Sequence, residues 1–252
     1  MAGQYIEPMR WPASSPARRP WPQGWLHLPG PCLLCGRWDR QSVCQQCLAR
    51  FVKRGDAVCP SCALPSIDGQ TCGACLRDPP PYARCIAALA YGFPWDRLVR
   101  RFKFNDQPEL AGMLASLMAA AIDQAAATTV DCVLPVPLSS ARLAERGYNQ
   151  AWELARRLAA QQGLAVQANA LLRLRDTPHQ VGLGRRERAR NLRDSMWVDP
   201  AAAPGLMGRH VALVDDVLTT GMTAAASSRA LLGAGVASVQ LWVLARTPAP
   251  QG

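Results

Sequence analysis

From about Tyr82 onward, the hydrophobic positions of the chain alternate between short continuous runs and longer runs with helical spacing. Residues 130–136 (VDCVLPV) form a mostly apolar run with prolines at its end, which predicts a buried strand. In the next segment Ala or Leu stands at positions 151, 154, 155, 158 and 159, the spacing of one helix face. This pattern predicts an amphipathic helix that Gly163 can end.

The same alternation continues toward the C-terminus. Residues 211–214 predict a second buried strand, and residues 236–245 predict a third. Between them, residues 222–232 predict a helix that Gly233 and Gly235 stop. Strand, helix and strand of these lengths form a βαβ unit, so we expect an α/β fold over residues 82–252, a parallel sheet flanked by helices.

The first 81 residues lack this periodicity. Residues 1–31 are rich in Pro, Trp and Arg and predict an irregular tail, to which we assign no function. Residues 32–81 are polar and rich in paired cysteines, so hydrophobic burial alone could not hold a fold there. Prolines 79 to 81 break regular structure and mark the boundary to the α/β region.

Composition narrows the class of protein. The chain has 252 residues, of which 49% are hydrophobic and 18% charged, enough for one sizeable core or two modest ones, and wholesale disorder is excluded. The longest uncharged stretch near the middle covers residues 110–122, whereas a membrane span takes roughly 20 residues. The N-terminus has no apolar run typical of a secretion signal. We therefore expect a cytoplasmic protein without membrane insertion.

Charge is unevenly distributed along the chain. The net charge is +10, and Lys53 and Lys103 are the two lysines among 28 basic residues. Residues 173–193 hold seven arginines against Asp176 and Glu187, and this local excess predicts an anion site.

Eight of the ten cysteines form four C-x-x-C pairs. They are Cys32 and Cys35, Cys44 and Cys47, Cys59 and Cys62, and Cys72 and Cys75. Two such pairs supply the four ligands of a tetrahedral zinc, and four thiolates leave no open position for catalysis. We predict two structural zinc sites in a double zinc ribbon, paired sequentially in the simplest arrangement or interleaved in the alternative. A redox motif or an iron–sulfur cluster is a further alternative. Cys85 and Cys132 stand outside the pairs and predict buried small side chains.

Residues 211–223 (VALVDDVLTTGMT) combine an apolar strand, two acids and a hydroxyl-bearing turn that opens a helix. Backbone N–H groups and threonine hydroxyls at a helix N-terminus favour a phosphate, and Gly221 lets the backbone approach it closely. Asp215 and Asp216 follow the strand, where carboxylates can accept hydrogen bonds from ribose hydroxyls. The alternative to a sugar-phosphate site is a capped helix with exposed acids and no ligand.

Residues 211–223 closely resemble the phosphoribosyl pyrophosphate (PRPP) signature of type I phosphoribosyltransferases. Other segments narrow the resemblance: residues 91–104 (YGFPWDRLVRRFKF), residues 135–139 (PVPLS), residues 146–150 (RGYNQ), and Gln180, Leu183, Arg188 and Asn191. Together they are similar to the ComF family of competence-associated, phosphoribosyltransferase-like proteins, in which a cysteine-rich zinc domain precedes the transferase-like domain.

The resemblance implies a role for each part of the site. Asp215 and Asp216 would hold the ribose hydroxyls. Residues 138–146 with Gly147 would form the pyrophosphate loop, where the guanidinium forks of Arg142 and Arg146 match phosphate oxygens. The 5′-phosphate would be bound by Thr219, Thr220, Gly221, Met222 and Thr223.

The arginine-rich residues 173–193 stand where the superfamily has a flexible loop that closes over PRPP. Our candidates within that segment are Arg175, Gln180 and Arg188. Many of these enzymes have a lysine there, whereas this segment has only arginines and Lys103 lies far upstream. A solvated arginine face is the alternative, for this segment and for Arg142 and Arg146.

Two functions follow from the resemblance. In the first, Asp215, Asp216 and Arg146 catalyse phosphoribosyl transfer from PRPP to an unidentified acceptor, with Mg²⁺ neutralising the pyrophosphate that leaves. In the second, the protein is a non-catalytic sensor of PRPP or a related nucleotide that binds single-stranded DNA or a partner in the DNA-uptake machinery. The basic net charge favours a nucleic-acid partner.

Overall fold

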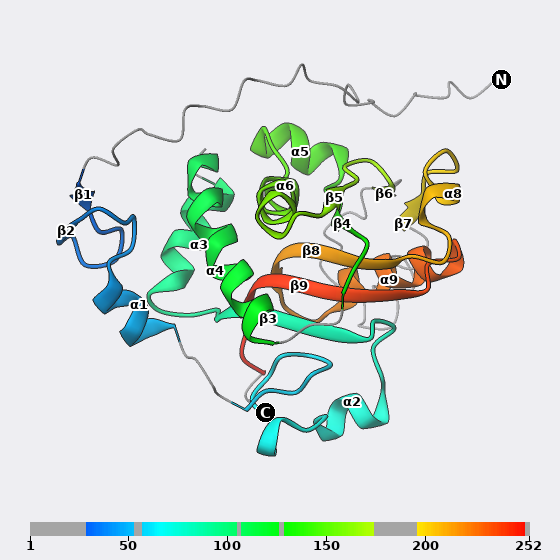
Figure 1. The fold of residues 1–252 in the computed structure, drawn as a ribbon, viewed down its shortest axis with the longest axis horizontal. Coiled ribbons are helices and arrows are strands. Elements are labelled where there is room, and N and C mark those ends of the chain that lie inside the picture. Colours follow the sequence, from blue (N-terminus) through cyan, green and yellow to red (C-terminus); the bar gives the residue numbers. More distant parts are fainter. Residues whose placement is uncertain (1–28, 53–56, 105–106, 126–128, 174–195, 250–252) are drawn as a thin grey trace, which may run out of the picture.

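The structure is a computed structural model that describes residues 29–52, 57–104, 107–125, 129–173 and 196–249. At its centre lies a parallel sheet of five strands in the order β3, β9, β8, β4 and β5 (Figure 1). The strands are β3 (Arg84–Ala90), β4 (Cys132–Pro135), β5 (Ala165–Val166), β8 (His210–Leu218) and β9 (Ser238–Arg246). The parallel sheet predicted from the hydrophobic pattern is therefore confirmed.

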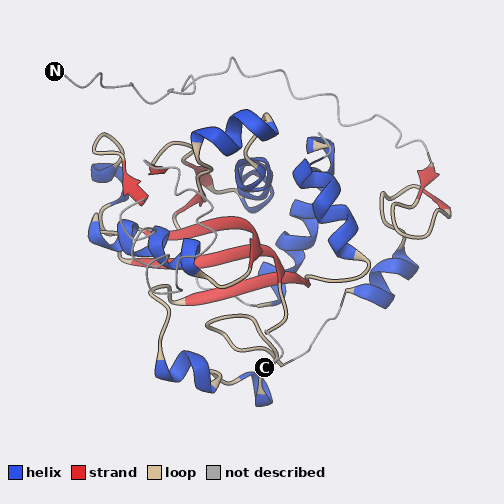
Figure 2. Ribbon diagram, turned by 180° about the vertical axis from the view of Figure 1, so that it is seen from behind, coloured by secondary structure: helices blue, strands red, loops and turns tan. Residues whose placement is uncertain are grey.

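Helices cover both faces of this sheet (Figure 2). One face packs against α3 (Trp95–Phe104), α4 (Ala111–Gln124), which the short helix η2 (Pro108–Leu110) precedes, and α6 (Gln150–Gln162). The other face packs against α8 (Ala203–Leu206), α9 (Met222–Gly233) and the antiparallel pair β6 (Leu171–Arg173) and β7 (Met196–Val198). In the part of the chain that the structure describes, no helix has the length and apolar character to cross a membrane.

The central strand β8 is buried on both faces because its side chains alternate between the two cores. Ala212 and Val214 belong to the core beneath α4 and α6, whereas Val211 and Leu213 belong to the core beneath α9. The strand does not end at residue 214, as the hydrophobic run predicts. It continues through both acids to Leu218 because β9 goes on pairing beside it.

The other predicted elements are found close to their expected places. The 130–136 run forms β4, and the 236–245 run forms β9. The helix with Ala and Leu on one face is α6, and Gly163 ends it in the left-handed conformation at φ 66°. The helix predicted at residues 222–232 is α9, which takes in Gly233 as its last residue.

The strand order reverses between β4 and β8. The chain leaves β4 through α5 (Ser140–Arg146) and α6 to reach β5 on one side of β4, whereas β8 and then β9 lie on the other side. In open parallel sheets, ligands bind outside the carboxyl ends of the strands at such a reversal. The fold therefore predicts a binding site beyond the ends of β4 and β8.

The cysteine-rich segment forms two small units on different parts of the sheet domain (Figure 1). The first contains β1 (Gly30–Pro31), β2 (Trp38–Asp39) and α1 (Gln45–Phe51), and the second contains η1 (Ile67–Gly69) and α2 (Gly73–Arg77). The first unit contacts α3, where the Trp95 indole N–H donates to the carbonyl of Phe51 at 3.0 Å. The second unit contacts β3, where the Cys85 N–H donates to the carbonyl of Pro60 at 2.8 Å. The predicted irregular tail lies, up to residue 28, outside the described residues.

Asn149 connects the start of α6 to the end of β4. Its side-chain oxygen accepts hydrogen bonds from the N–H groups of Ala151 and Trp152, and its side-chain amide donates to the carbonyl of Val136 at 3.1 Å. We expect Asn149→Ala to lower the free energy of unfolding by about 1–2 kcal/mol, the usual cost of a lost N-cap. Urea unfolding measures this, with Asn149→Ser as the control that keeps a capping oxygen. A serine variant as unstable as the alanine variant would contradict the capping role.

Candidate functional site

The eight paired cysteines gather into two separate groups of four. Cys32, Cys35, Cys44 and Cys47 form the first, and Cys59, Cys62, Cys72 and Cys75 form the second, with all sulfurs of a group within 4.8 Å of one another. The sequential pairing is therefore confirmed and the interleaved alternative is wrong. The distance between sulfur atoms is 3.9 Å from Cys32 to Cys47, 3.8 Å from Cys35 to Cys44, and 3.7 Å from Cys62 to Cys72.

These distances fit four thiolates around a single ion. Zn–S bonds of about 2.3 Å in a tetrahedron place the sulfurs about 3.8 Å apart. An iron–sulfur cluster sets its cysteine ligands around several metal atoms and needs wider spacing. Backbone N–H groups also favour the thiolate form, since those of Cys44 and Cys72 donate to the sulfurs of Cys32 and Cys59 at 3.3 Å. Both groups of cysteines therefore have the donor set and the geometry of structural zinc sites, and every ligand position is filled.

The remaining two cysteines are buried side chains of the core. Cys85 on β3 is 4% exposed and Cys132 on β4 is fully buried. Burial raises the pKa of both thiols, to about 12 for Cys85. Their sequence interpretation as small buried side chains is confirmed.

A cavity of about 330 Å³ lies beyond the carboxyl ends of β4 and β8, where the strand order predicts a ligand site. Six of the predicted site residues line it: Arg142, Arg146, Asp215, Asp216, Thr219 and Thr223. They come from the segment after β4, from β8, from the turn that follows β8 and from the first turn of α9. Arg142 and Asp215, 73 positions apart in the sequence, thus reach one cavity because β4 and β8 are neighbours in the sheet.

The two acids of this cavity have different surroundings. Asp216 forms an ion pair with Lys103, with its carboxylate oxygen 2.9 Å from Nζ. Asp215 is partly buried and accepts a hydrogen bond from the N–H of Asp216 at 2.8 Å. Burial and the neighbouring charge of Asp216 raise the pKa of Asp215 to about 7, against the opposing effect of Lys103. The cavity therefore holds one carboxylate paired with a cation and one carboxyl group that titrates near neutral pH.

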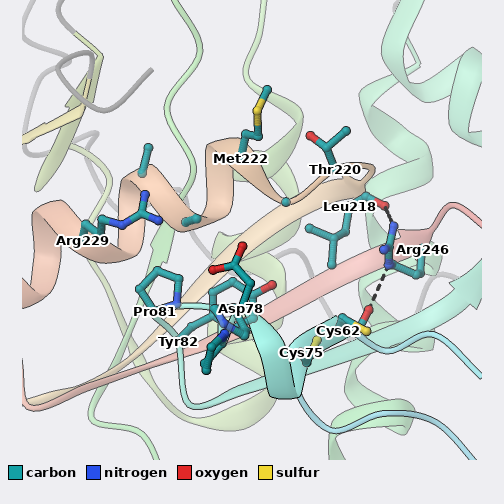
Figure 3. Close-up of a pocket in the computed structure, with 15 residues that line it drawn as sticks. Cys62, Cys75, Asp78, Pro81, Tyr82, Leu218, Thr220, Met222, Arg229 and Arg246 are labelled. Carbon is teal, nitrogen blue, oxygen red and sulfur yellow. Dashed lines mark hydrogen bonds between the residues drawn. The ribbon is translucent and has the colours of Figure 1, made fainter. Parts of the chain in front are cut away.

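The turn between β8 and α9 carries the residues expected to hold a phosphate. Gly221 has φ 78°, a left-handed conformation that suits glycine, and α9 begins at the next residue, Met222. Thr219 and Thr223 face the 330 Å³ cavity, whereas Thr220, Gly221 and Met222 border a second cavity of about 580 Å³ on the other side of the turn (Figure 3). The turn thus separates two cavities.

The expected pyrophosphate loop is mostly helical. Residues 138–146 were predicted as a loop, but Ser140–Arg146 forms α5, since the Ser139 hydroxyl caps its start and Gly147, at φ 73°, ends it. Both arginines nevertheless border the cavity. The Arg146 guanidinium lies over the ring of Phe104, 4.8 Å from its centre, and donates to the Gln150 side chain at 3.2 Å.

Sequence reasoning missed several side chains of this cavity. Lys103 at the end of α3 reaches Asp216, and Tyr91 and Thr247 also line the cavity. Arg173 at the end of β6, the first residue of the arginine-rich segment predicted as an anion site, lines it as well. The apolar spacing of Trp95, Leu98, Val99 and Phe102 could have placed Lys103 at the edge of a buried helix face. The candidates Arg175, Gln180 and Arg188 lie outside the described residues.

The raised pKa of Asp215 predicts a dependence of stability on pH. In the unfolded chain an aspartate titrates near 3.9, so between about pH 4 and pH 7 the folded protein holds more protons and loses stability as pH rises. We expect Asp215→Asn to raise the melting temperature relative to the wild type at about pH 8 and to leave it nearly unchanged at about pH 4. Thermal unfolding at both pH values measures this. Because Lys103 lowers the pKa of Asp215, Lys103→Met should move the pH at which Asp215 titrates to a higher value. Equal effects of Asp215→Asn at both pH values would contradict it.

The fold and its preceding metal units define a class of protein. A five-stranded parallel sheet of this order with helices on both faces, following two groups of four cysteines, is a type I phosphoribosyltransferase fold behind a zinc-ribbon segment. The family model of the double zinc ribbon domain matches residues 25–76, which include all four cysteine pairs.

Relatives of the whole chain narrow this class. The chain is 36% identical over 233 residues to "DNA utilization protein YhgH" of Salmonella typhimurium, covering 88% of this chain and 99% of the relative. It is 36% identical to "Competence protein F" of Haemophilus influenzae over 70% of this chain and 79% of the relative. "Competence protein ComFC" of Bacillus subtilis is 26% identical over 82% of this chain and 85% of its own. The chain belongs to the ComF family.

Among solved structures, glutamine PRPP amidotransferase from B. subtilis, in complex with ADP and GMP, is similar with a TM-score of 0.41 at 17% identity. The similarity covers 58% of this chain and 30% of that chain. An alanine variant of the invariant aspartate of HPRTs has a TM-score of 0.34 at 14% identity, over 58% of this chain and 79% of its own.

Proposed function

We propose that the protein binds PRPP with Mg²⁺ in the cavity beyond β4 and β8. The observation that carries this proposal is the meeting, in one cavity, of two adjacent acids near the end of a parallel strand, two threonines from the β8–α9 junction, Thr219 and Thr223, and two arginines. Acids accept hydrogen bonds from sugar hydroxyls, the turn offers N–H groups to a phosphate, and arginine binds phosphate in a forked geometry. PRPP carries hydroxyls, a phosphate and a pyrophosphate on one ribose, so its binding site needs all three kinds of group.

Each group has a distinct task in this proposal. Asp215 and Asp216 bind the ribose hydroxyls. The turn from Thr219 to Thr223, whose two end threonines line the cavity, binds the 5′-phosphate. Arg142 and Arg146 bind the pyrophosphate, and Lys103 and Arg173 add positive charge to a ligand that is strongly anionic. Bound Mg²⁺ neutralises charge on the pyrophosphate. The positive groups that line the cavity outnumber its two acids, which suits such a ligand.

As an enzyme, the protein would transfer the phosphoribosyl group. The bond between C1 of the ribose and the pyrophosphate oxygen breaks, both electrons leave with pyrophosphate, and an acceptor forms the new bond to C1 and gives up a proton. Asp215, Asp216 and Arg146 are the proposed catalytic residues, because in this proposal the acids hold the ribose and Arg146 holds the leaving group. Arg175, Gln180 and Arg188 are proposed to close over the ligand.

The names of the relatives suggest where this chemistry is used. We propose that the chain, like the relatives named for DNA utilization and competence, takes part in the cellular use of incoming DNA in the cytoplasm. A sensor that also binds single-stranded DNA is the second candidate, and exposed aromatic side chains favour it. Trp38 is 72% exposed and Phe93 is 73% exposed, and the Arg97 guanidinium lies 5.8 Å from the centre of the Phe93 ring. Aromatic rings and arginine planes are the groups on which single-stranded bases stack.

Pyrophosphate release distinguishes the two candidates. The zinc-loaded protein is incubated with PRPP and Mg²⁺, alone and with nucleobases or single-stranded DNA as acceptors. Release that depends on an acceptor and is lost in Arg146→Ala supports an enzyme. PRPP binding without release, together with an affinity for single-stranded DNA that falls with salt and in Phe93→Ala, supports the sensor.

A further inference from the structure

Arg246, the last residue of β9, connects the turn between β8 and α9 to the second cysteine unit (Figure 3). Its Nη1 donates to the carbonyls of Leu218 and Thr219, at 2.8 and 2.5 Å. Its Nε donates to the carbonyl of Cys62, 184 residues earlier in the chain, at 2.9 Å. One guanidinium therefore bridges a metal ligand's backbone and the start of the turn.

The two carbonyls that Arg246 binds belong to the peptide units that lead into the turn. In a trans peptide the C=O and the N–H point in opposite directions. Since the carbonyls of Leu218 and Thr219 point toward Arg246, the N–H groups of Thr219 and Thr220 point away from it. A cationic donor on the carbonyl side also polarises both peptide units and makes their N–H groups stronger donors to an anion.

Further contacts join the second cysteine unit to the same region. Cys62 and Cys75 border the 580 Å³ cavity from one side, and Thr220 and Met222 border it from the other (Figure 3). Tyr82, which follows this unit in the chain, is buried, and a Cβ at Gly221 would lie 3.8 Å from its hydroxyl. Cys85 donates its N–H to Pro60, inside the first C-x-x-C pair of the unit. The segment between Cys59 and Cys62 is thus attached to the sheet domain at two points, Pro60 and Cys62.

We infer that Arg246 is a positioning residue through which the metal at Cys59, Cys62, Cys72 and Cys75 sets the phosphate affinity of the turn before α9. The metal orders the Cys62 peptide, the Cys62 carbonyl holds the Arg246 side chain, and Arg246 orients the Leu218 and Thr219 peptides. The first cysteine unit contacts α3 and has no such contact with the turn in the described residues. This inference rests on the proposed binding of PRPP, and it assigns the second metal site a part in ligand binding.

Two halves of PRPP serve as probes. Ribose 5-phosphate reports on the turn before α9, whereas pyrophosphate reports on the side of the cavity that carries Arg142 and Arg146. We expect Arg246→Ala to weaken ribose 5-phosphate binding about tenfold, the effect of losing charge-assisted hydrogen bonds, and to leave pyrophosphate binding unchanged. The affinity of Arg246→Lys for ribose 5-phosphate should lie between those of the wild type and Arg246→Ala, because one ammonium cannot span both the Cys62 carbonyl and the carbonyls of the turn. Calorimetry measures both ligands.

Arg229→Ala is the matched control. Arg229 is an exposed arginine of α9 that borders the same 580 Å³ cavity, so its loss changes the charge of the cavity. We expect the affinity of Arg229→Ala for ribose 5-phosphate and for pyrophosphate to stay at the wild-type value. Equal losses in Arg229→Ala and Arg246→Ala, or a loss of pyrophosphate binding equal to that of ribose 5-phosphate, would overturn the inference.

A double-variant cycle tests the role of the metal. We expect Cys62→Ser to lose one of two zinc ions per chain, counted by mass spectrometry, and to weaken ribose 5-phosphate binding as Arg246→Ala does. If both act through one contact, the double variant binds no more weakly than either single variant. Additive losses would overturn the coupling. Where Cys62→Ser does not fold, the comparison of Arg246→Ala with Arg246→Lys and Arg229→Ala decides the matter.

The outcomes separate this inference from the proposed function. A wild-type protein that binds neither PRPP nor its halves contradicts the proposed function and, with it, the inference. A wild-type protein that binds PRPP, with an Arg246→Ala variant that binds ribose 5-phosphate equally well, contradicts the inference alone.

Discussion

The double variant Asp215→Asn/Asp216→Asn is expected to lose PRPP binding while it keeps its fold. Each carboxylate accepts a hydrogen bond from a ribose hydroxyl in the proposed complex, and each bond to a charged acceptor contributes about 1.5–3 kcal/mol. Their joint loss should weaken binding at least about a hundredfold. Equilibrium dialysis with labelled PRPP in the presence of Mg²⁺ measures the change.

The control for this variant removes the same charge elsewhere. Asp68 and Asp123 are exposed and lie outside the cavity, so Asp68→Asn/Asp123→Asn should bind PRPP as the wild type does. The fold of Asp215→Asn/Asp216→Asn is checked by its cooperative thermal unfolding. Removal of the buried Asp215 charge raises stability, whereas loss of the Asp216 ion pair with Lys103 lowers it, so the melting temperature alone does not report on the fold. Undiminished PRPP binding in the Asp215→Asn/Asp216→Asn variant would contradict the assignment of the ribose site.

Removal of zinc is expected to unfold the cysteine-rich segment and to leave the sheet domain folded. Four thiolates whose sulfurs all lie within 4.8 Å of one another cannot stay together without a cation, and the described residues between 29 and 77 include few other buried side chains. Structural zinc contributes about 10–16 kcal/mol to the folding of small zinc-binding peptides. We therefore expect a strong chelator to expose this segment to protease cleavage, while the sheet domain still unfolds cooperatively on heating.

Metal analysis and limited proteolysis test this expectation. The folded protein should contain two zinc ions per chain, one for each group of cysteines. Added zinc should restore protease resistance, and magnesium, which prefers oxygen ligands, should not. A metal-free protein with an intact cysteine-rich segment would contradict the structural role of both sites.

The central strands and helices were predictable because their burial leaves a plain sequence signal. Residues 211–214 of β8 are buried on both faces and form a continuous apolar run, and α6 is buried on one face and repeats Ala and Leu at helical spacing. The length of β8 was not predictable from its own residues. The two acids interrupt the apolar run, and it is pairing with β9, a segment far along the chain, that keeps them in the strand.

The site was predictable where one segment carries the chemistry. The acids and the turn from Thr219 to Thr223 form a local motif, so the sequence alone was enough to propose them, and both acids line the cavity. Lys103 was missed because the residues around it do not predict its 2.9 Å contact with Asp216. That contact depends on how α3 packs over the sheet. Arg246 was missed for the same reason, since its partners lie 28 and 184 positions away in the chain.

The most direct test of the account is a calorimetric titration of the full-length, zinc-loaded protein with PRPP in the presence of Mg²⁺. We expect saturable binding of one PRPP per chain, because the cavity that holds both acids among the described residues accommodates one ribose. Binding should weaken when Mg²⁺ is left out. A protein that carries two zinc ions, unfolds cooperatively and yet gives no saturable heat with PRPP would contradict it.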